Sequence, residues 1–288
     1  MAVKFFGQFL VENNIVSREA LLKAIDLQEQ KNLKFGEMAL SLGCVSKEDI
    51  ERAHNAQMSK DMKLGDVLVE MGILTQNQLS DIVTRQNNTH LYIGEALVQV
   101  GALNSEQLQK HLEAFKQDQA QYVAERIELP AGIADNLVWE MAADMTYKMI
   151  TRMLGLQFRP VKCQAVPAVN ANFMMAAMDL TGDVEARYVI SVSEKVQKEI
   201  AKAILREDSV DNEPLEVLED TVMEFANVIC GNIAAKASQM GKVIHINPPV
   251  ALHPPATGLQ APSGSTALSF PIYLGEGNSM EMALFIKK

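Results

Sequence analysis

The chain has few cysteines, few aromatic residues and no excess of positive charge. Its 288 residues include 3 cysteines and 6% aromatic residues, and its formal net charge is −10. The cysteines, Cys44, Cys163 and Cys230, are odd in number and scattered in apolar sequence, so we expect buried thiols in a reducing compartment rather than a disulfide framework. The acidic balance excludes a broad surface for nucleic acid or anionic membranes.

Long apolar runs and the common catalytic fingerprints are also absent. No stretch reaches the roughly 20 apolar residues of a membrane-spanning helix, and the N-terminal residues lack the apolar core of a signal peptide. The 5 histidines show no metal-ligand spacing. Neither a G-x-S-x-G motif, a P-loop nor a dinucleotide fingerprint is present. We therefore expect a cytoplasmic protein with no membrane insertion, no nucleic-acid partner and no metal or cofactor of its own.

Residues 1–115 contain a repeat with a period of 29 residues, which is marked by four glycines: Gly7, Gly36, Gly65 and Gly94. Each copy then has a residue suited to a left-handed helix end, at Asn14, Gly43, Gly72 and Gly101. An N-cap residue follows, at Ser17, Ser46, Thr75 and Asn104. Each copy therefore predicts a helical hairpin that buries its apolar face against a neighbour. We expect two copies to close a capping box.

The segment from Lys63 to Gln86 resembles the MshEN motif, which also occurs at the N-terminus of type II secretion ATPases. In that family R-L-G-x-x-L-x-x-x-G…L-x-x-x-L-x-x-Q units occur in tandem, and the pair binds cyclic di-GMP. Here two 24-residue units, 34–57 and 63–86, flank a five-residue spacer, which is the family's spacing. The resemblance implies two such pairs and a nucleotide site in the middle pair, formed by Lys34, Gly36, Gln57, Lys63, Gly65 and Gln86.

Lysine stands in that site where the motif has arginine. Arginine offers a planar fork for a guanine edge or a phosphate, whereas lysine offers a point charge. A dimerisation or partner-docking module without a ligand therefore stays open as the alternative reading of the repeats.

Residues 135–288 predict an α+β domain, which follows a polar linker at residues 116–134. We expect helices over 136–154, 194–205 and 214–240, and strands over 161–169, 172–180, 186–193, 242–246, 266–274 and 280–286. Residues 247–265 are rich in proline and glycine and predict an irregular loop. The whole chain is thus predicted as α+β, with all-helical hairpin repeats before a sheet that long helices cover on one face.

The helix expected over 214–240 is amphipathic, and Asp211 or Asn212 can cap its start. Its apolar residues form a stripe: Leu215, Leu218, Val222, Phe225, Ile229, Ile233 and Met240. At about 100° per residue, Glu224 and Asn227 point away from this stripe. The same face carries Asp220, Gly231, Ala234 and Ala235. We predict a face that is exposed and smooth enough for the helix backbone to approach another protein closely.

The run Glu224-Phe-Ala-Asn227-Val-Ile-Cys-Gly231-Asn232 resembles the E-x-x-N signature of the CheC/CheX family of chemotaxis phosphatases. Residues 246–251 resemble the segment that follows this helix in the family. The resemblance implies hydrolysis of the phospho-aspartate of a CheY-like response regulator, which brings its own Mg²⁺. Asn227 would orient the attacking water and Glu224 would anchor the regulator, with Asp220, Gly231, Ala234 and Ala235 in contact with it.

The resemblance also implies a homodimer formed through the sheets, and one active face in each chain. The helix over 136–154 has Ala143 where a second signature needs asparagine. Two functions remain open. The predicted one is a response-regulator phosphatase that the repeats regulate, with cyclic di-GMP as their ligand. The alternative is a non-catalytic signalling adapter, since glutamate and asparagine on a wet helix face are in most proteins merely solvated.

Overall fold

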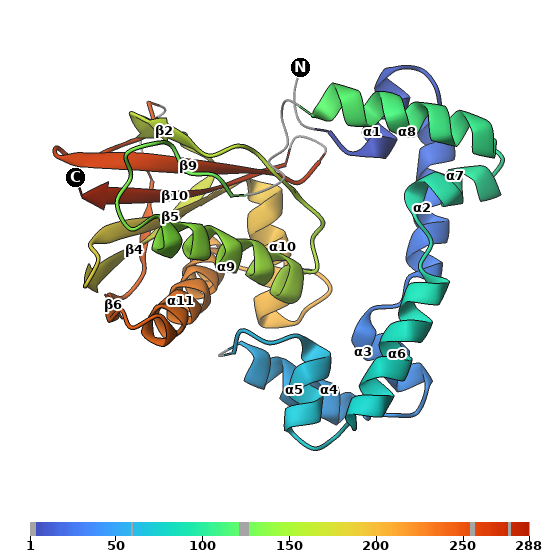
Figure 1. Ribbon diagram of the computed structural model, residues 1–288, viewed down its shortest axis with the longest axis horizontal. Coiled ribbons are helices and arrows are strands. Elements are labelled where there is room, and N and C mark those ends of the chain that lie inside the picture. Colours follow the sequence, from blue (N-terminus) through green and yellow to red (C-terminus); the bar gives the residue numbers. More distant parts are fainter. Residues whose placement is uncertain (1–3, 59, 121–126, 254–256, 276–277, 288) are drawn as a thin grey trace. The chain divides into compact units, whose positions relative to one another are not determined.

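The computed structural model describes residues 4–58, 60–120, 127–253, 257–275 and 278–287. The chain divides into two compact units (Figure 1). We call Ala2–Gln121 the helical unit, and Tyr122–Lys288 together with Met1 the sheet unit. In the described part of the chain, no helix combines the length and the apolar character needed to cross a membrane.

The described residues of the helical unit form four hairpins, as the repeat predicts (Figure 1). The helices are α1 (Phe6–Glu12), α2 (Arg18–Lys31), α3 (Phe35–Ser41), α4 (Lys47–Gln57), α5 (Leu64–Glu70), α6 (Gln76–Thr89), α7 (Ile93–Gln99) and α8 (Ser105–Gln119). Helix α8 continues to Gln119, past residue 115, where the repeats were expected to end. Gln119 is buried at 2% exposure and accepts a hydrogen bond from the Lys4 backbone nitrogen at 2.8 Å.

The turn and cap residues of each hairpin adopt the geometry that the sequence predicts. The helix-ending residues have positive φ angles: Asn14 (56°), Gly43 (68°), Gly72 (70°) and Gly101 (74°). The side chains of Ser17, Ser46, Thr75 and Asn104 each accept a bond from the third backbone N–H of the next helix. Capping boxes close in three of these second helices, not two, because the Asp49 carboxylate also reaches the Ser46 backbone nitrogen at 3.0 Å.

The marker glycine lets the two helices of a hairpin pack closely. A Cβ added at Gly7 or Gly94 would lie 2.6 Å from a methyl carbon of Leu21 or Leu108. A Cβ added at Gly65 would likewise overlap a methyl carbon of Leu79. Since the contact recurs at the same spacing in the first, third and fourth copies, the 29-residue period records helix packing.

The hairpins pair in a nested order. Buried residues of the first and fourth copies form one hydrophobic core, which includes Leu10, Ala24, Leu97 and Phe115. Buried residues of the second and third copies form another core, which includes Ala39, Ala53, Leu68 and Ile82. Helix α2 therefore packs on α7, while α4 packs on α5. The helical unit thus consists of an outer pair and an inner pair of hairpins.

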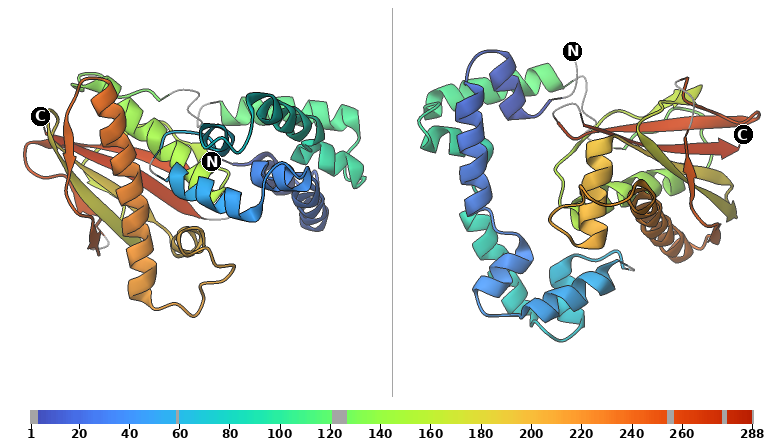
Figure 2. Two further views of the ribbon diagram at one scale, coloured as in Figure 1. Left: turned by 90° about the horizontal axis from the view of Figure 1, so that it is seen from below. Right: turned by 180° about the vertical axis from the view of Figure 1, so that it is seen from behind.

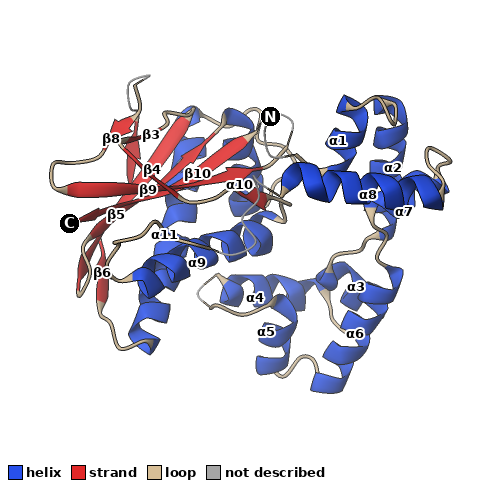
Figure 3. Cartoon of the chain, turned by 45° about the horizontal axis from the view of Figure 1, so that its top comes forward, coloured by secondary structure: helices blue, strands red, loops and turns tan. Residues whose placement is uncertain are grey.

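The sheet unit is mixed α and β, as predicted (Figure 3). Its helices are α9 (Asn136–Leu154), α10 (Glu194–Leu205) and α11 (Leu215–Gln239). Its strands are β1 (Arg159–Pro160), β2 (Gln164–Val166), β3 (Ala168–Val169), β4 (Met174–Gly182), β5 (Ala186–Val192), β6 (Ile244–Ile246), β7 (Val250–Leu252), β8 (Leu259–Gln260), β9 (Ser265–Tyr273) and β10 (Ser279–Lys287).

The main sheet is antiparallel, with the strand order β1-β9-β10-β5-β4-β6 in the described residues. Strands β4 and β5, both predicted as strands, form a hairpin in which Leu180 faces Ala186. The expectation of an irregular segment over 247–265 is wrong in part, because β7 pairs with β4 and β8 pairs with β3 there. The strand expected over 161–169 is split into β2 and β3 at Pro167, which has no N–H to donate.

Helices α9, α10 and α11 pack on one face of the sheet (Figures 1 and 2). Alternate strand residues such as Met178, Tyr188 and Phe270 are buried under them. The expectation that long helices cover one face of the sheet is confirmed, but the opposite face is covered as well. A second core lies on the opposite face, around Met175, Val189 and Phe285, with further contacts from segments 166–169 and 252–261.

A buried carboxylate lies on this second face. Glu281 is 8% exposed and accepts a hydrogen bond from Ser269 Oγ at 2.6 Å, with further bonds from Asn170. Burial raises the pKa of Glu281 above the ordinary value of 4.5, although these hydrogen bonds oppose the shift.

The raised pKa predicts how the stability of the sheet unit changes with pH. Between the unfolded and folded pKa values of Glu281, the folded state binds more protons than the unfolded state, so the free energy of unfolding falls as pH rises from 4.5 through the folded pKa. Glu281→Gln should flatten this part of the profile. Urea unfolding at a series of pH values, followed by fluorescence of Trp139, measures it, because this tryptophan is alone in the sequence and buried in the sheet unit. If the free energy of unfolding of Glu281→Gln changed with pH as steeply as that of the wild type, the pH dependence could not be assigned to Glu281.

Candidate functional site

Helix α11 presents the candidate site, and its local structure follows from its sequence. It begins after Pro214, whose fixed φ suits a helix start, and it is followed by Gly241 with φ of 78°. Residues at helical spacing are buried against the sheet and its neighbouring helices, from Leu218 and Val222 to Ile233. Leu215 and Met240 are 54% and 43% exposed, contrary to the prediction, because they lie at the two ends of the helix, beyond the core.

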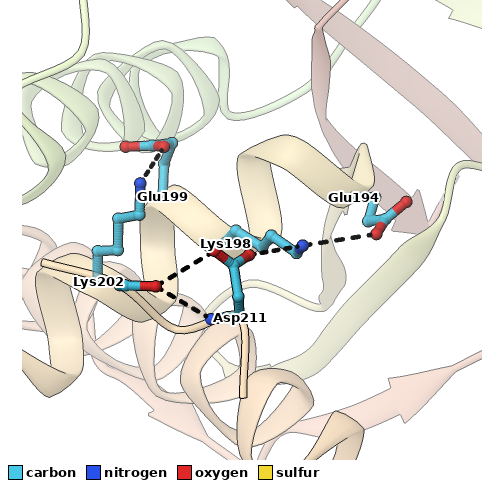
Figure 4. Close-up of polar contacts among 6 residues, drawn as sticks. Glu194, Lys198, Glu199, Lys202 and Asp211 are labelled. Atoms are coloured by element: carbon cyan, nitrogen blue, oxygen red, sulfur yellow. Dashed lines mark hydrogen bonds and ion pairs between the residues drawn. The ribbon is translucent and has the colours of Figure 1, made fainter. Parts of the chain in front are cut away.

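The loop before α11 is held by α10 rather than by a side-chain cap. No side chain caps the α11 N-terminus, so the predicted capping role of Asp211 or Asn212 is wrong. Asp211 instead accepts a hydrogen bond from Lys198 of α10 at 3.0 Å (Figure 4). This bond lowers the pKa of Asp211 and raises that of Lys198. Val210, at 1% exposure, packs nearby with Ala201. These contacts fix the start of α11.

Ser193 stands at the N-cap position of α10, but its side chain does not bond the helix. Its hydroxyl accepts from the Ser279 backbone nitrogen at 3.4 Å.

The exposed face of α11 carries the sequence-predicted residues together. Glu224 is exposed and Asn227 is half-buried, and Asn227 Nδ2 donates a hydrogen bond to Glu224 Oε2 at 3.3 Å. Asp220 and Ala235 are exposed, while Gly231 and Ala234 are half-buried. No heavy atom lies within 4 Å of a Cβ placed at Gly231. A polar pair is therefore followed along this face by residues too small to hold another protein at a distance.

Helix α9 offers no such pair at the corresponding position. Ala143 is fully buried, and Asp144 forms an ion pair with Lys148 at 2.7 Å. Met145 and Met149 are buried, whereas Leu137 is 70% exposed because it lies in the first turn. The structure thus brings a glutamate and an asparagine together on the exposed face of α11, and not on α9.

The three cysteines are free thiols with different exposure. Cys230 is buried, whereas Cys44 and Cys163 are only partly buried. The expectation of buried thiols is therefore fully confirmed only for Cys230. Burial raises the pKa of the Cys163 thiol to about 12, and it raises that of Cys230 as well. High thiol pKa values keep these two side chains protonated and unreactive. Among the described residues, no three His, Cys, Asp or Glu side chains are grouped so that they could hold a metal ion.

The residues predicted for a nucleotide lie in the inner pair of hairpins. Lys34 and Lys63 are exposed, and Gly36 and Gly65 are buried in helix contacts. The two glutamines, Gln57 and Gln86, make a structural contact that was not expected from the sequence. Each side-chain amide donates a hydrogen bond to a backbone carbonyl that lies just before the first helix of the other copy. The bonds are Gln57 to Met62 and Gln86 to Leu33, both 2.9 Å.

The same contact recurs in the outer pair, which gives the closing glutamine of the repeat a structural role. Gln28 donates to the Leu91 carbonyl at 2.9 Å. In the fourth copy Phe115 replaces the glutamine and packs on Phe6 and Phe9, with ring centroids 5.3 and 5.4 Å apart. The recurrence of glutamine at the end of three copies was the sequence signal for this contact.

Part of the sheet unit resembles a known protein family. Residues 174–273 match the family model described as chemotaxis phosphatase CheX. The matched segment runs from β4 to β9 and contains the whole of α11. No curated protein matches the chain. The CheX match therefore places the Glu224–Asn227 pair inside a segment that resembles a phosphatase family.

Solved structures of CheX proteins are similar to this chain. The CheX protein of Desulfovibrio desulfuricans is 16% identical, with 52% of this chain and 99% of that chain covered and a TM-score of 0.46. The CheX protein of Vibrio vulnificus is 15% identical, with coverages of 52% and 99% and a TM-score of 0.46. CheX in a CheX–CheY–BeF₃–Mg²⁺ complex from Borrelia burgdorferi is 22% identical, with coverages of 52% and 98% and a TM-score of 0.45.

Proposed function

We propose that the chain hydrolyses the phospho-aspartate of a CheY-like response regulator. One observation carries the proposal: an exposed glutamate and a half-buried asparagine, hydrogen-bonded to each other, lie on α11, inside the segment that matches the chemotaxis phosphatase family. The small residues after the pair, Gly231, Ala234 and Ala235, allow the helix to approach the regulator's phosphorylation pocket. The regulator is the substrate and brings the acyl phosphate together with its Mg²⁺.

The chain's own contribution is positioning. Phosphoryl transfer needs an attacking oxygen in line with the leaving oxygen and stabilisation of charge, and little covalent chemistry from the protein. Asn227 holds the water in line, and Glu224 anchors the complex through a cation of the regulator. A carboxamide does not titrate, so the rate has no pH dependence that originates in Asn227.

The proposal is tested with the full chain and a phosphorylated CheY-like regulator from the same genome. We expect the regulator to lose phosphate faster with the chain present than alone, in proportion to the amount of chain added. Equal decay across all such regulators would contradict the enzymatic proposal and would favour the signalling adapter.

For the helical unit we propose a regulatory role, with cyclic di-GMP as the ligand of the inner pair of hairpins. Lys34 and Lys63 are exposed there and available to phosphate groups. Calorimetry on the full chain should show binding that the double variant Lys34→Ala, Lys63→Ala loses. No heat and no thermal stabilisation at high ligand concentration would favour partner docking instead.

The homodimer also stays a proposal, which rests on the family resemblance alone. We expect light scattering of the full chain to give twice the chain mass, and a mass equal to one chain would contradict it.

A further inference from the structure

The hydrogen bond between Asn227 and Glu224 determines which way the carboxamide faces. Nδ2 of Asn227 lies 3.3 Å from Oε2 of Glu224. An ionised carboxylate can only accept hydrogen bonds, so it must face the amide nitrogen and not the amide oxygen. With its nitrogen committed to Glu224, Asn227 turns its oxygen away from that carboxylate.

No other neighbour on α11 competes for this amide. The residues three and four positions from Asn227 are the ones that its side chain can reach along a helix. Apart from Glu224, these are Met223, which packs against the core, Cys230, which is buried, and Gly231, which has no side chain. In the described part of the chain, Glu224 is the hydrogen-bond partner of the Asn227 amide.

We propose that Glu224 is a positioning residue that acts through Asn227: it holds the carboxamide so that its oxygen accepts a hydrogen bond from the attacking water. This inference rests on the proposed phosphatase function. A water aimed at phosphorus must direct a lone pair at it and needs an acceptor for one of its O–H groups. The amide oxygen accepts, whereas the amide nitrogen only donates.

The step itself is a hydrolysis. The water oxygen bonds to phosphorus, and the bond from phosphorus to the aspartyl oxygen breaks with its electron pair left on the carboxylate. One water proton stays on the attacking oxygen and the other ends on a phosphate oxygen, which leaves aspartate and inorganic phosphate. Glu224 has two carboxylate oxygens, so the anchoring contact and the bond to Asn227 are compatible.

Two variants of Glu224 separate positioning from anchoring. Glu224→Gln removes the charge but keeps a carbonyl oxygen that accepts from Asn227, while Glu224→Ala removes both. We expect Glu224→Gln to raise KM and to keep kcat within about twofold, and Glu224→Ala to raise KM and to lower kcat by about tenfold or more. Equal kcat values in both variants, with changes in KM alone, would overturn the proposal. Asp144→Asn, which breaks an exposed ion pair on α9, is the matched control and should leave kcat and KM unchanged.

Nuclear magnetic resonance of the Asn227 side chain tests the positioning without any enzymatic assay. The full chain should show one ordered NH₂ signal pair in the wild type and in Glu224→Gln, and motionally averaged signals in Glu224→Ala. Identical signals in all three proteins would overturn the positioning role. A wild type that removes no phosphate but shows ordered signals would instead contradict the proposed function and leave the positioning contact in place.

Discussion

Asn227→Ala is expected to reduce the acceleration of regulator dephosphorylation by about a hundredfold, because in-line positioning of the water supplies much of the rate. The stability of the fold should be unchanged, because the Asn227 side chain forms its hydrogen bond with Glu224 on the helix surface and alanine favours helix. Single-turnover decay of the phosphorylated regulator, with the chain in excess, measures the effect on the chemical step.

The control for this variant is Asn212→Ala. It removes an exposed carboxamide from the loop just before α11, where no side-chain cap is made, and should keep full activity. Unfolding followed through Trp139 should give the same midpoint for all three proteins. An Asn227→Ala protein that is as fast as the wild type would show that the attacking water is placed by some other group.

Gly182→Ala is expected to lower the free energy of unfolding of the sheet unit by about 3 kcal/mol, from strain and overlap together. Gly182 has a φ of 117°, and an added Cβ would overlap the backbone oxygen of Val243. That oxygen accepts the Asp183 N–H at 2.9 Å, while the Asp183 carboxylate accepts from the Val243 N–H at 2.8 Å. The turn between β4 and β5 therefore cannot move away without breaking its bonds to the segment after α11.

Urea unfolding followed by Trp139 fluorescence measures this loss. Gly264→Ala is the matched control, because Gly264 has a similar left-handed backbone (φ of 80°) with no heavy atom near an added Cβ. Gly264→Ala should lower the free energy of unfolding by only about 1 kcal/mol, because the backbone conformation alone disfavours alanine there. Equal losses in the two variants would mean that the contact with Val243 is unimportant.

Features that depend on neighbouring residues could be predicted from the sequence. The hairpin turns at Gly43 and Gly72 and the caps at Ser46 and Thr75 are short-range devices, and each was found where expected. The angle between residues on one helix is likewise local, so Glu224 and Asn227 could be placed on the exposed face of α11. Helix periodicity does not show where the core stops, so Leu215 and Met240 were wrongly expected to be buried.

Features that depend on distant residues could not be predicted. Gln28 bonds Leu91, and their positions in the sequence do not show that the first copy pairs with the fourth. The second core of the sheet was missed because short strands such as β7 and β8 form only where another strand pairs with them. The contact between Asp211 and Lys198 competes with helix capping, and the propensity of aspartate for an N-cap does not reveal this competitor.

The nested pairing of the hairpins limits how the length of the helical unit can change. A shortened chain that lacks the two inner copies keeps the first and fourth copies paired. A chain that lacks only the first copy leaves the hydrophobic face of the fourth copy exposed to solvent. Duplication of repeats should therefore add copies two at a time, inserted between the second and third copies so that each new pair packs together.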